Sequence, residues 1–188
     1  MAMGLHRKIV GAHLRRCDGF TLVELMVAIA LAAAAALYAA PAFDQWRMRE
    51  RVDARARTLL GAVSFARTEA GRLGGRVTLC RAGPAGDCVR ADEPCDPAAW
   101  SCGWIVSGQF DGQSRVLRRY PRDPDIAVTG ATHDLAFAPP AGQVIGGIRR
   151  FELRAQRERP GDEARTSRCI RISAGGRARI VAGRCDAA

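Results

Sequence analysis

The chain has 188 residues, which suits one modest domain together with an anchor or tail and excludes several large domains. Hydrophobic residues make up 48% of it, as in an ordinary globular protein, and its formal net charge is +10. Lys8 is the single lysine, so nearly all of the positive charge is arginine. A basic surface favours the binding of polyanions such as nucleic acid or lipid headgroups. The alternative explanation of the arginine excess is a GC-rich genome, which enriches alanine, glycine and arginine.

An apolar stretch from Phe20 to Ala40 carries a single charge, that of Glu24. As a helix rising about 1.5 Å per residue it is roughly 30 Å long, enough to cross the hydrocarbon core of a bilayer. The preceding segment is basic, and bases beside an apolar span tend to stay cytoplasmic, so we expect the chain after Phe43 on the other side. Glu24 needs a partner or a function, because a carboxylate inside an apolar span is costly. The simpler alternative is an ordinary signal anchor with one glutamate.

The run Gly-Phe-Thr-Leu-Val-Glu-Leu at residues 19–25 resembles the processing signal of type IV pilins and of the pseudopilins of type II secretion. The resemblance implies that a prepilin peptidase cuts between Gly19 and Phe20 and methylates the new N-terminal Phe20. It also implies that Glu24 pairs with the N-terminal amine of a neighbouring subunit, which agrees with the need of a buried carboxylate for a cation. Cleavage removes a leader, residues 1–19, and leaves 25 basic and 18 acidic residues, a net charge of +7.

A second helical pattern follows Pro41, which lies where many members of this family kink the helix. Apolar residues recur at spacings of three and four, namely at Met48, Val52, Ala56, Leu59, Val63, Ala66, Ala70 and Leu73. Gly74-Gly75 is a natural stop. We expect one helix from Phe20 to Leu73, with residues 20–42 in the membrane and an amphipathic second half, residues 43–74, packed on a head. A free-standing coiled coil is disfavoured because the stripe is short and rich in alanine.

Residues 75–188 are expected to form a β-rich head. The predicted strands are Arg76–Arg81, Gly103–Phe110, Arg115–Tyr120, Ile126–Thr129, Leu135–Ala138, Ile148–Ala155, Arg168–Ser173 and Arg177–Ala182. Residues 82–102 are rich in glycine, proline, aspartate and cysteine and predict a long loop, and Arg157–Thr166 predicts a polar one.

Cysteines supply the next constraint. Cys17 belongs to the leader, and six remain in the part predicted to lie outside the cytoplasm: Cys80, Cys88, Cys95, Cys102, Cys169 and Cys185. In an oxidising compartment they predict up to three disulfides, and the sequence leaves all 15 pairings open. A zinc site at the first four is the alternative, although they lack the close Cys-x-x-Cys pairs of structural zinc sites.

Five segments from residue 66 onward resemble the GspH/FimT branch of minor pilins and pseudopilins. They are Ala-Arg-Thr-Glu-Ala at 66–70, Val-Thr-Leu-Cys at 77–80, Gly-Trp-Ile-Val at 103–106, Leu-Ala-Phe-Ala-Pro at 135–139 and Gly-Gly-Arg-Ala-Arg at 175–179. Their order along the chain carries the resemblance. It implies an α+β, pilin-like fold in which a long N-terminal helix packs on an antiparallel, disulfide-stapled head.

The segment Arg168–Cys185 contains no acidic residue, and its pattern predicts a basic hairpin with a turn at residues 173–176. Strand alternation places Arg177 and Arg179 on one face, and a Cys169–Cys185 disulfide, one of the open pairings, would staple the two strands near their far ends. Guanidinium groups suit phosphate, because they offer it a planar fork of donors. The candidate DNA-binding residues are Arg168, Arg171, Gly176, Arg177, Arg179 and Arg184.

Residues 176–179, Gly-Arg-Ala-Arg, are similar to a motif associated with DNA capture in FimT-like minor pilins during natural transformation. The resemblance implies double-stranded DNA as a partner. No aromatic residue lies in the hairpin to stack on bases, so recognition is expected to be directed at the backbone and insensitive to sequence. The alternative is that this is only the closing strand of the head, with its arginines solvated or paired with acids.

Enzymatic interpretations are disfavoured. His6 and His13 belong to the leader, and His133 has no nucleophile signature beside it. We therefore expect no catalytic residue, no cofactor and no metal. The expected function is that of a minor type IV pilin of the bacterial inner membrane, with its head in the periplasm and later in a pilus at the cell surface. Its partners are prepilin peptidase, other pilins or pseudopilins through the N-terminal helix, and DNA. A minor pseudopilin of a type II secretion system is the alternative.

Overall fold

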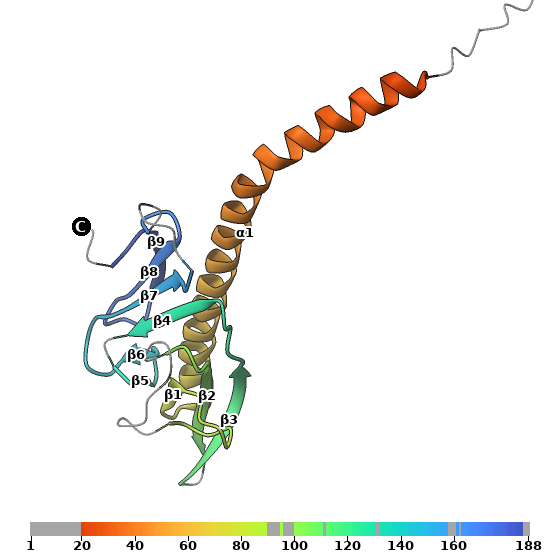
Figure 1. Cartoon of the computed structure of the whole chain (residues 1–188). Coiled ribbons are helices and arrows are strands. Elements are labelled where there is room, and N and C mark those ends of the chain that lie inside the picture. Colours follow the sequence, from red (N-terminus) through yellow and green to blue (C-terminus); the bar gives the residue numbers. More distant parts are fainter. Residues whose placement is uncertain are drawn as a thin grey trace, which may run out of the picture. The chain divides into compact units, whose positions relative to one another are not determined.

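We describe a computed structural model of the chain, which covers residues 20–89, 95, 100–110, 112–130, 132–157, 161 and 163–185. The chain divides into two compact units, Met1–Ala42 and Phe43–Ala188. Figure 1 labels the secondary structure of the described residues. It consists of α1 (Leu22–Leu73), β1 (Val77–Arg81), β2 (Trp104–Phe110), β3 (Gln113–Tyr120), β4 (Ile126–Gly130), β5 (Asp134–Ala138), β6 (Gln143–Val144), β7 (Arg149–Ala155), β8 (Ser167–Ile172) and β9 (Ala178–Ala182).

Helix α1 begins at Leu22 rather than at the predicted Phe20, because Thr21 caps it. The Thr21 hydroxyl accepts a hydrogen bond from the backbone N–H of Glu24 (3.2 Å), which satisfies one of the free donors of the first turn. The helix continues through Pro41 to the predicted end at Leu73. By length and composition it can cross a membrane, with a mean hydropathy of 2.2 over its most apolar window.

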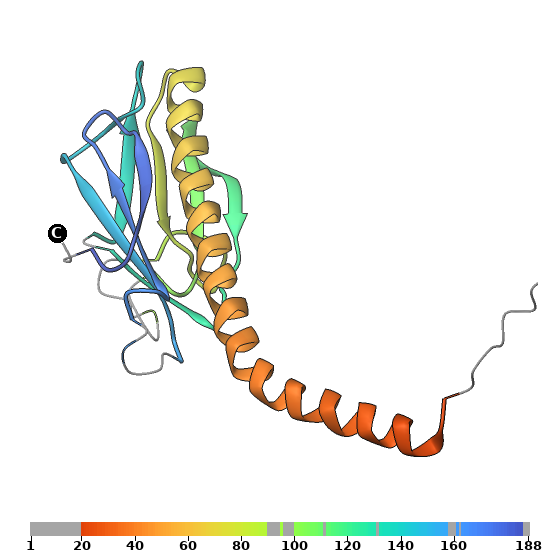
Figure 2. The ribbon, with the colours of Figure 1, turned by 90° about the horizontal axis from the view of Figure 1, so that it is seen from above.

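The second half of α1 packs on the sheets of the head, as the apolar stripe predicts. The stripe residues from Val52 to Ala70 are fully buried, and Met48 and Leu73 at its ends are partly buried. Figure 2 shows this part of the helix running beside the strands. The coiled-coil alternative is wrong, because the chain's own strands already cover the apolar face.

The head contains two antiparallel sheets. The first has the strand order β3-β2-β1-β5-β6, and the second has the order β4-β7-β8-β9. Their inner faces share one core with the helix, in which Trp104, Phe137 and Phe151 are at most 1% exposed. The predicted α+β class is therefore confirmed, and each predicted strand is present with small shifts at its ends. Strand β6 was not predicted, since its two residues are too few to show alternation.

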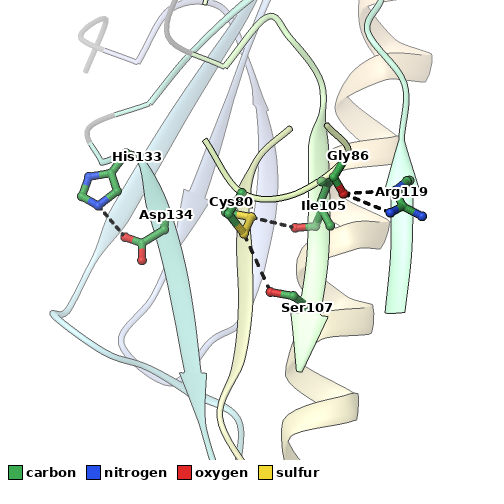
Figure 3. Close-up of a disulfide and its surroundings, with 8 residues drawn as sticks. Cys80, Gly86, Ile105, Ser107, Arg119, His133 and Asp134 are labelled. Carbon is green, nitrogen blue, oxygen red and sulfur yellow. Dashed lines mark hydrogen bonds and ion pairs between the residues drawn. A yellow bond between two sulfur atoms is a disulfide. The ribbon is translucent and has the colours of Figure 1, made fainter. Parts of the chain in front are cut away.

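Three disulfides join the six cysteines of the head: Cys80–Cys88, Cys95–Cys102 and Cys169–Cys185. The zinc alternative is wrong, because disulfide formation uses every thiol of the proposed cluster. In Figure 3 the first disulfide lies against β2, where the Cys80 sulfur is 3.7 Å from the carbonyl oxygen of Ile105. Beside it, Arg119 on β3 donates to the carbonyl oxygen of Gly86 (3.0 Å), so a short loop closed by the disulfide is also tied to the sheet.

Arginines connect the helix to the sheets, and the contacts of Arg55 and Arg168 are the most buried of those described. Arg55 is 8% exposed, and its guanidinium carbon lies 3.8 Å from the centre of the Trp104 ring, a cation–π contact. Burial lowers the pKa of Arg55 from its ordinary value, and the charge of Asp123 partly opposes this. Arg168 on β8 donates through Nε and Nη2 to the two carboxylate oxygens of Asp53 on α1. This bidentate ion pair is largely shielded from water and holds β8 against the helix.

We predict that Asp53→Ala lowers the free energy of unfolding of the head by about 1–3 kcal/mol, because it leaves the partly buried Arg168 without its carboxylate. The measurement is urea denaturation of the full chain in non-ionic detergent, followed by the fluorescence of the buried Trp100 and Trp104. Glu50→Ala is the matched control, since it removes an exposed acid from the same helix. Equal losses in the two variants would contradict the prediction.

Candidate processing site and nucleic-acid interface

The segment that resembles a processing signal reaches into the start of α1. Gly19 lies outside the described residues, Phe20 is 80% exposed just before the helix, and Glu24 lies in its first turn. The helix N-terminus carries partial positive charge and favours a carboxylate there. None of the described residues forms an ion pair with Glu24. Its carboxylate therefore has no cationic partner within the described part of the subunit.

The hairpin of β8 and β9 turns at Ser173–Gly176. The N–H of Gly176 donates to the carbonyl oxygen of Ser173 (2.8 Å), and the N–H of Ser173 donates to that of Arg177 (2.9 Å). Gly176 is buried and has a φ of +75°, which glycine adopts without strain. A Cβ there would also lie 2.2 Å from the carbonyl oxygen of Gly142. Packing and backbone conformation, rather than access for a ligand, therefore explain this glycine.

Contacts with the helix and the first sheet hold this turn in place. Arg67 on α1 donates from Nε to the carbonyl oxygen of Ala141 (3.3 Å), and its side chain also lies beside Gly176. The N–H of Val144 on β6 donates to the carbonyl oxygen of Ala174 in the turn (2.9 Å). No local sequence pattern predicts the Arg67 contact, because its partners lie far along the chain. These contacts determine where β9 begins and hence where Arg177 stands.

Three arginines form a row across the second sheet. Arg150 on β7 is paired in register with Arg171 on β8, and Arg171 is paired with Arg179 on β9. Neighbouring strands lie about 4.8 Å apart, so the three side chains start on one face at that spacing. Arg177 precedes Arg179 by two residues and leaves the chain on the same side. The sheet thus gathers four positive charges, although like charges opposite each other destabilise a sheet.

The four arginines line one groove of about 540 Å³. Its lining residues are Ile148, Arg150, Arg171, Ile172, Ser173, Arg177, Ala178 and Arg179. None of the four arginines forms an ion pair with a described residue. The Nε of Arg171 is buried and has no hydrogen-bond partner in the described part of the chain. An unpaired buried donor is costly, so the position of Arg171 destabilises the fold.

The remaining predicted arginines lie elsewhere. Arg168 is engaged with Asp53, and Arg184 lies 3.6 Å from the carboxylate of Glu152. Glu152 also accepts from the N–H of Cys185 (3.0 Å), so the end of the described chain is fixed to β7 beside the Cys169–Cys185 disulfide. The structure therefore brings Arg171, Arg177 and Arg179 together and adds Arg150. Only the strand register reveals Arg150, which lies outside the basic hairpin.

His133 has a carboxylate beside it rather than a nucleophile. Its Nε2 lies 3.5 Å from the Asp134 carboxylate, and both side chains are about half exposed (Figure 3). The six cysteines of the head are all in disulfides, so none of them offers a thiolate to this histidine.

We predict that Gly176→Ala destabilises the head more than Gly74→Ala does. Alanine at a positive φ costs about 1–2 kcal/mol at either position, but only at Gly176 does the new Cβ meet a backbone oxygen. Gly74 has a φ of +61° and open space around its Cβ, which makes it the matched control. Thermal unfolding of both variants measures the difference. Equal losses of stability in the two variants would contradict the prediction, because they would mean that the turn moves away from the carbonyl oxygen of Gly142 without further loss.

Comparison with known proteins places these features in a family. The family described as type II transport protein GspH matches residues 55–176, and the prokaryotic N-terminal methylation motif matches residues 14–40. No curated protein matches the sequence.

The fold is similar to that of the type IV minor pilin FimU of Pseudomonas aeruginosa strain PAO1 in two crystal forms, at 16% identity in each. The TM-scores are 0.50, over 69% of this chain and 91% of FimU, and 0.53, over 71% and 90%. Since the GspH match spans well over half of the sequence, this chain belongs to the GspH family, and it also carries a prokaryotic N-terminal methylation motif.

Proposed function

We propose that this protein is a minor type IV pilin that captures double-stranded DNA at the arginine groove. The observation that carries the proposal is the set of four arginines without ion pairs among the described residues: Arg150, Arg171, Arg177 and Arg179. If this sheet served only to complete the head, acidic or neutral residues at these positions would make it more stable than opposed arginines do. A bound polyanion would neutralise the four charges. This function would explain why the protein keeps an arrangement that destabilises its fold.

Processing and assembly come first in the proposed mechanism. Prepilin peptidase cuts after Gly19 and frees the amine of Phe20, which it methylates. The apolar half of α1 holds the subunit in the inner membrane with its head in the periplasm, and then packs among the helices of other pilins. Glu24 pairs with the Phe20 amine of a neighbour, because both charges are costly in an apolar bundle unless they meet.

DNA binding follows from the chemistry of the groove. Each guanidinium offers a planar pair of donors that fits two oxygens of one phosphate. The described residues that line the groove include no aromatic side chain for base stacking and no acid that would repel phosphate. Backbone contacts of this kind fix the position of a duplex and do not read its sequence. If four phosphates are neutralised, log K should fall with log salt at a slope of about −3 to −4.

A minor pseudopilin of a type II secretion system is the second candidate, favoured by the description of the matching family. The fold, the cleavage and the role of Glu24 would be the same in that machine. The two functions differ at the groove, because a secretion pseudopilin has no need of free DNA. Genomic neighbours and DNA affinity therefore discriminate between them.

We predict that the double variant Arg177→Ala/Arg179→Ala binds duplex DNA at least about tenfold more weakly than the parent. The expected loss reflects two charged hydrogen-bonding groups, each contributing more than about 1 kcal/mol. Affinity for a fluorescent duplex is measured against salt concentration, with the full chain in non-ionic detergent. The slope should also become shallower by about two.

The matched control is Arg57→Ala/Arg115→Ala, which removes two exposed arginines outside the groove at the same change in net charge. We expect it to retain most of the affinity. Equal behaviour of the two double variants, or no binding by the parent, would make the groove purely structural and leave the protein as an assembly subunit.

We predict that Glu24→Ala abolishes incorporation into filaments and leaves cleavage intact, because it removes the proposed partner of the neighbouring amine. Mass spectrometry of the membrane-extracted chain measures the loss of residues 1–19 and the added methyl group. Immunoblots of sheared filaments measure incorporation. Glu50→Ala, in the same helix but outside the apolar span, should assemble normally. Normal incorporation of Glu24→Ala would exclude the proposed pairing.

A further inference from the structure

The loop between β6 and β7 exposes two isoleucines. Ile148 is 69% exposed and Ile145 is 42% exposed. No other large hydrophobic side chain is exposed among the described residues after α1. Leaving apolar surface in water forgoes roughly 25 cal/mol per Å², so a protein that holds an isoleucine outward gives up stability. The position of Ile148 beside a charged groove makes it a candidate for contact with a ligand.

A neighbouring arginine fixes the conformation of this loop. Arg149 donates to the carbonyl oxygens of three residues, Ile145, Gly146 and Ile148. Gly146 and Gly147 have φ values of +91° and +87°, which let the chain turn back within two residues. The loop is therefore tied together through its own backbone, and the exposure of Ile148 follows from this arrangement.

Ile148 lines the same groove as the four arginines. Ile172 and Ala178 also border the groove, but Ile172 is fully buried and Ala178 packs against the core, so the exposed apolar part of the lining is Ile148 beside the arginines. Ile145, at the other end of the loop, does not line it. A ligand that fits the whole groove has to present anionic groups and an apolar surface within a few ångströms of each other.

We propose that Ile148 is an apolar wedge that contacts the bases of the captured duplex while the arginines hold its phosphates. This inference rests on the proposed function and specifies how the duplex is engaged. Duplex DNA offers both surfaces at the required distance, because the edges of its base pairs lie between two rows of phosphates. Apolar side chains, isoleucine among them, enter the minor groove of DNA at base steps, unstack the bases in part and bend the duplex.

Duplex DNA fits the groove better than a protein partner does. An apolar protein surface would cover Ile148 but leave four guanidinium groups unpaired at a dry interface, which is costly. The wedge adds binding free energy that does not depend on counterion release. Affinity therefore has two components, a salt-dependent one from the arginines and a salt-independent one from Ile148. Bending of the duplex is the physical signature of the second component.

The test compares Ile148→Ser with Ile145→Ser in the full chain in non-ionic detergent. The probe is a duplex of about 25 base pairs with a donor and an acceptor dye at its ends, titrated at several salt concentrations. We expect Ile148→Ser to weaken binding about three- to tenfold at every salt concentration, with an unchanged salt slope. The energy transfer that reports bending should be lost. Ile145→Ser should behave like the parent, and Ile148→Leu should retain most of the affinity and the bend.

The outcomes separate this inference from the proposed function. If the parent binds DNA through Arg177 and Arg179 and Ile148→Ser binds and bends it equally well, the wedge is wrong and DNA capture stands. If the parent binds no duplex, both are wrong. If Ile148→Ser binds DNA normally but fails to enter filaments, the loop is a contact between pilins and the wedge is again wrong. Thermal unfolding of each variant confirms that the head is intact.

Discussion

The burial of the alanine-rich face of α1 is the contact on which the rest of the head depends. Four alanines on this face, Ala56, Ala62, Ala66 and Ala70, are fully buried in one core with both sheets. Small side chains let the helix backbone come close to the strands, and the larger Leu59 and Val63 fill the space between them. A bulkier residue at an alanine position would push strands away from the helix and move every residue that they carry.

That close approach also places the polar contacts of the helix. Asp53 reaches Arg168 on the second sheet, and Arg67 reaches the loop at Ala141 beside the turn at Gly176. The first contact fixes one end of the β8–β9 hairpin, and the second fixes the other. The arginine groove is therefore positioned by residues that take no part in it. Substitutions on the helix should alter the groove without removing any of its charges.

The elements of the fold are predictable from sequence because their signals are local. The apolar stripe from Met48 to Leu73 has the period of a helix, and the strands of the head show alternation between glycine-rich turns. The candidate site is predictable only in part, since Arg177 and Arg179 lie in a recognisable short motif. Arg150 joins them through pairing between strands, which a local pattern does not contain. The disulfide partners are not predictable from a local pattern either, because six cysteines allow 15 pairings.

The arrangement of the arginines bears on their origin. A GC-rich genome would add arginines without regard to position, and the fold would then place them where solvent or an acid accommodates them. Arg51, Arg72, Arg168 and Arg184 fit that expectation, because each has a carboxylate partner. In the groove Arg150, Arg177 and Arg179 are exposed to solvent, whereas Arg171 is half-buried between two other arginines in register and keeps a buried Nε without a partner among the described residues. Composition accounts for the number of arginines in the protein, whereas the proposed polyanionic ligand would account for the grouping of these four.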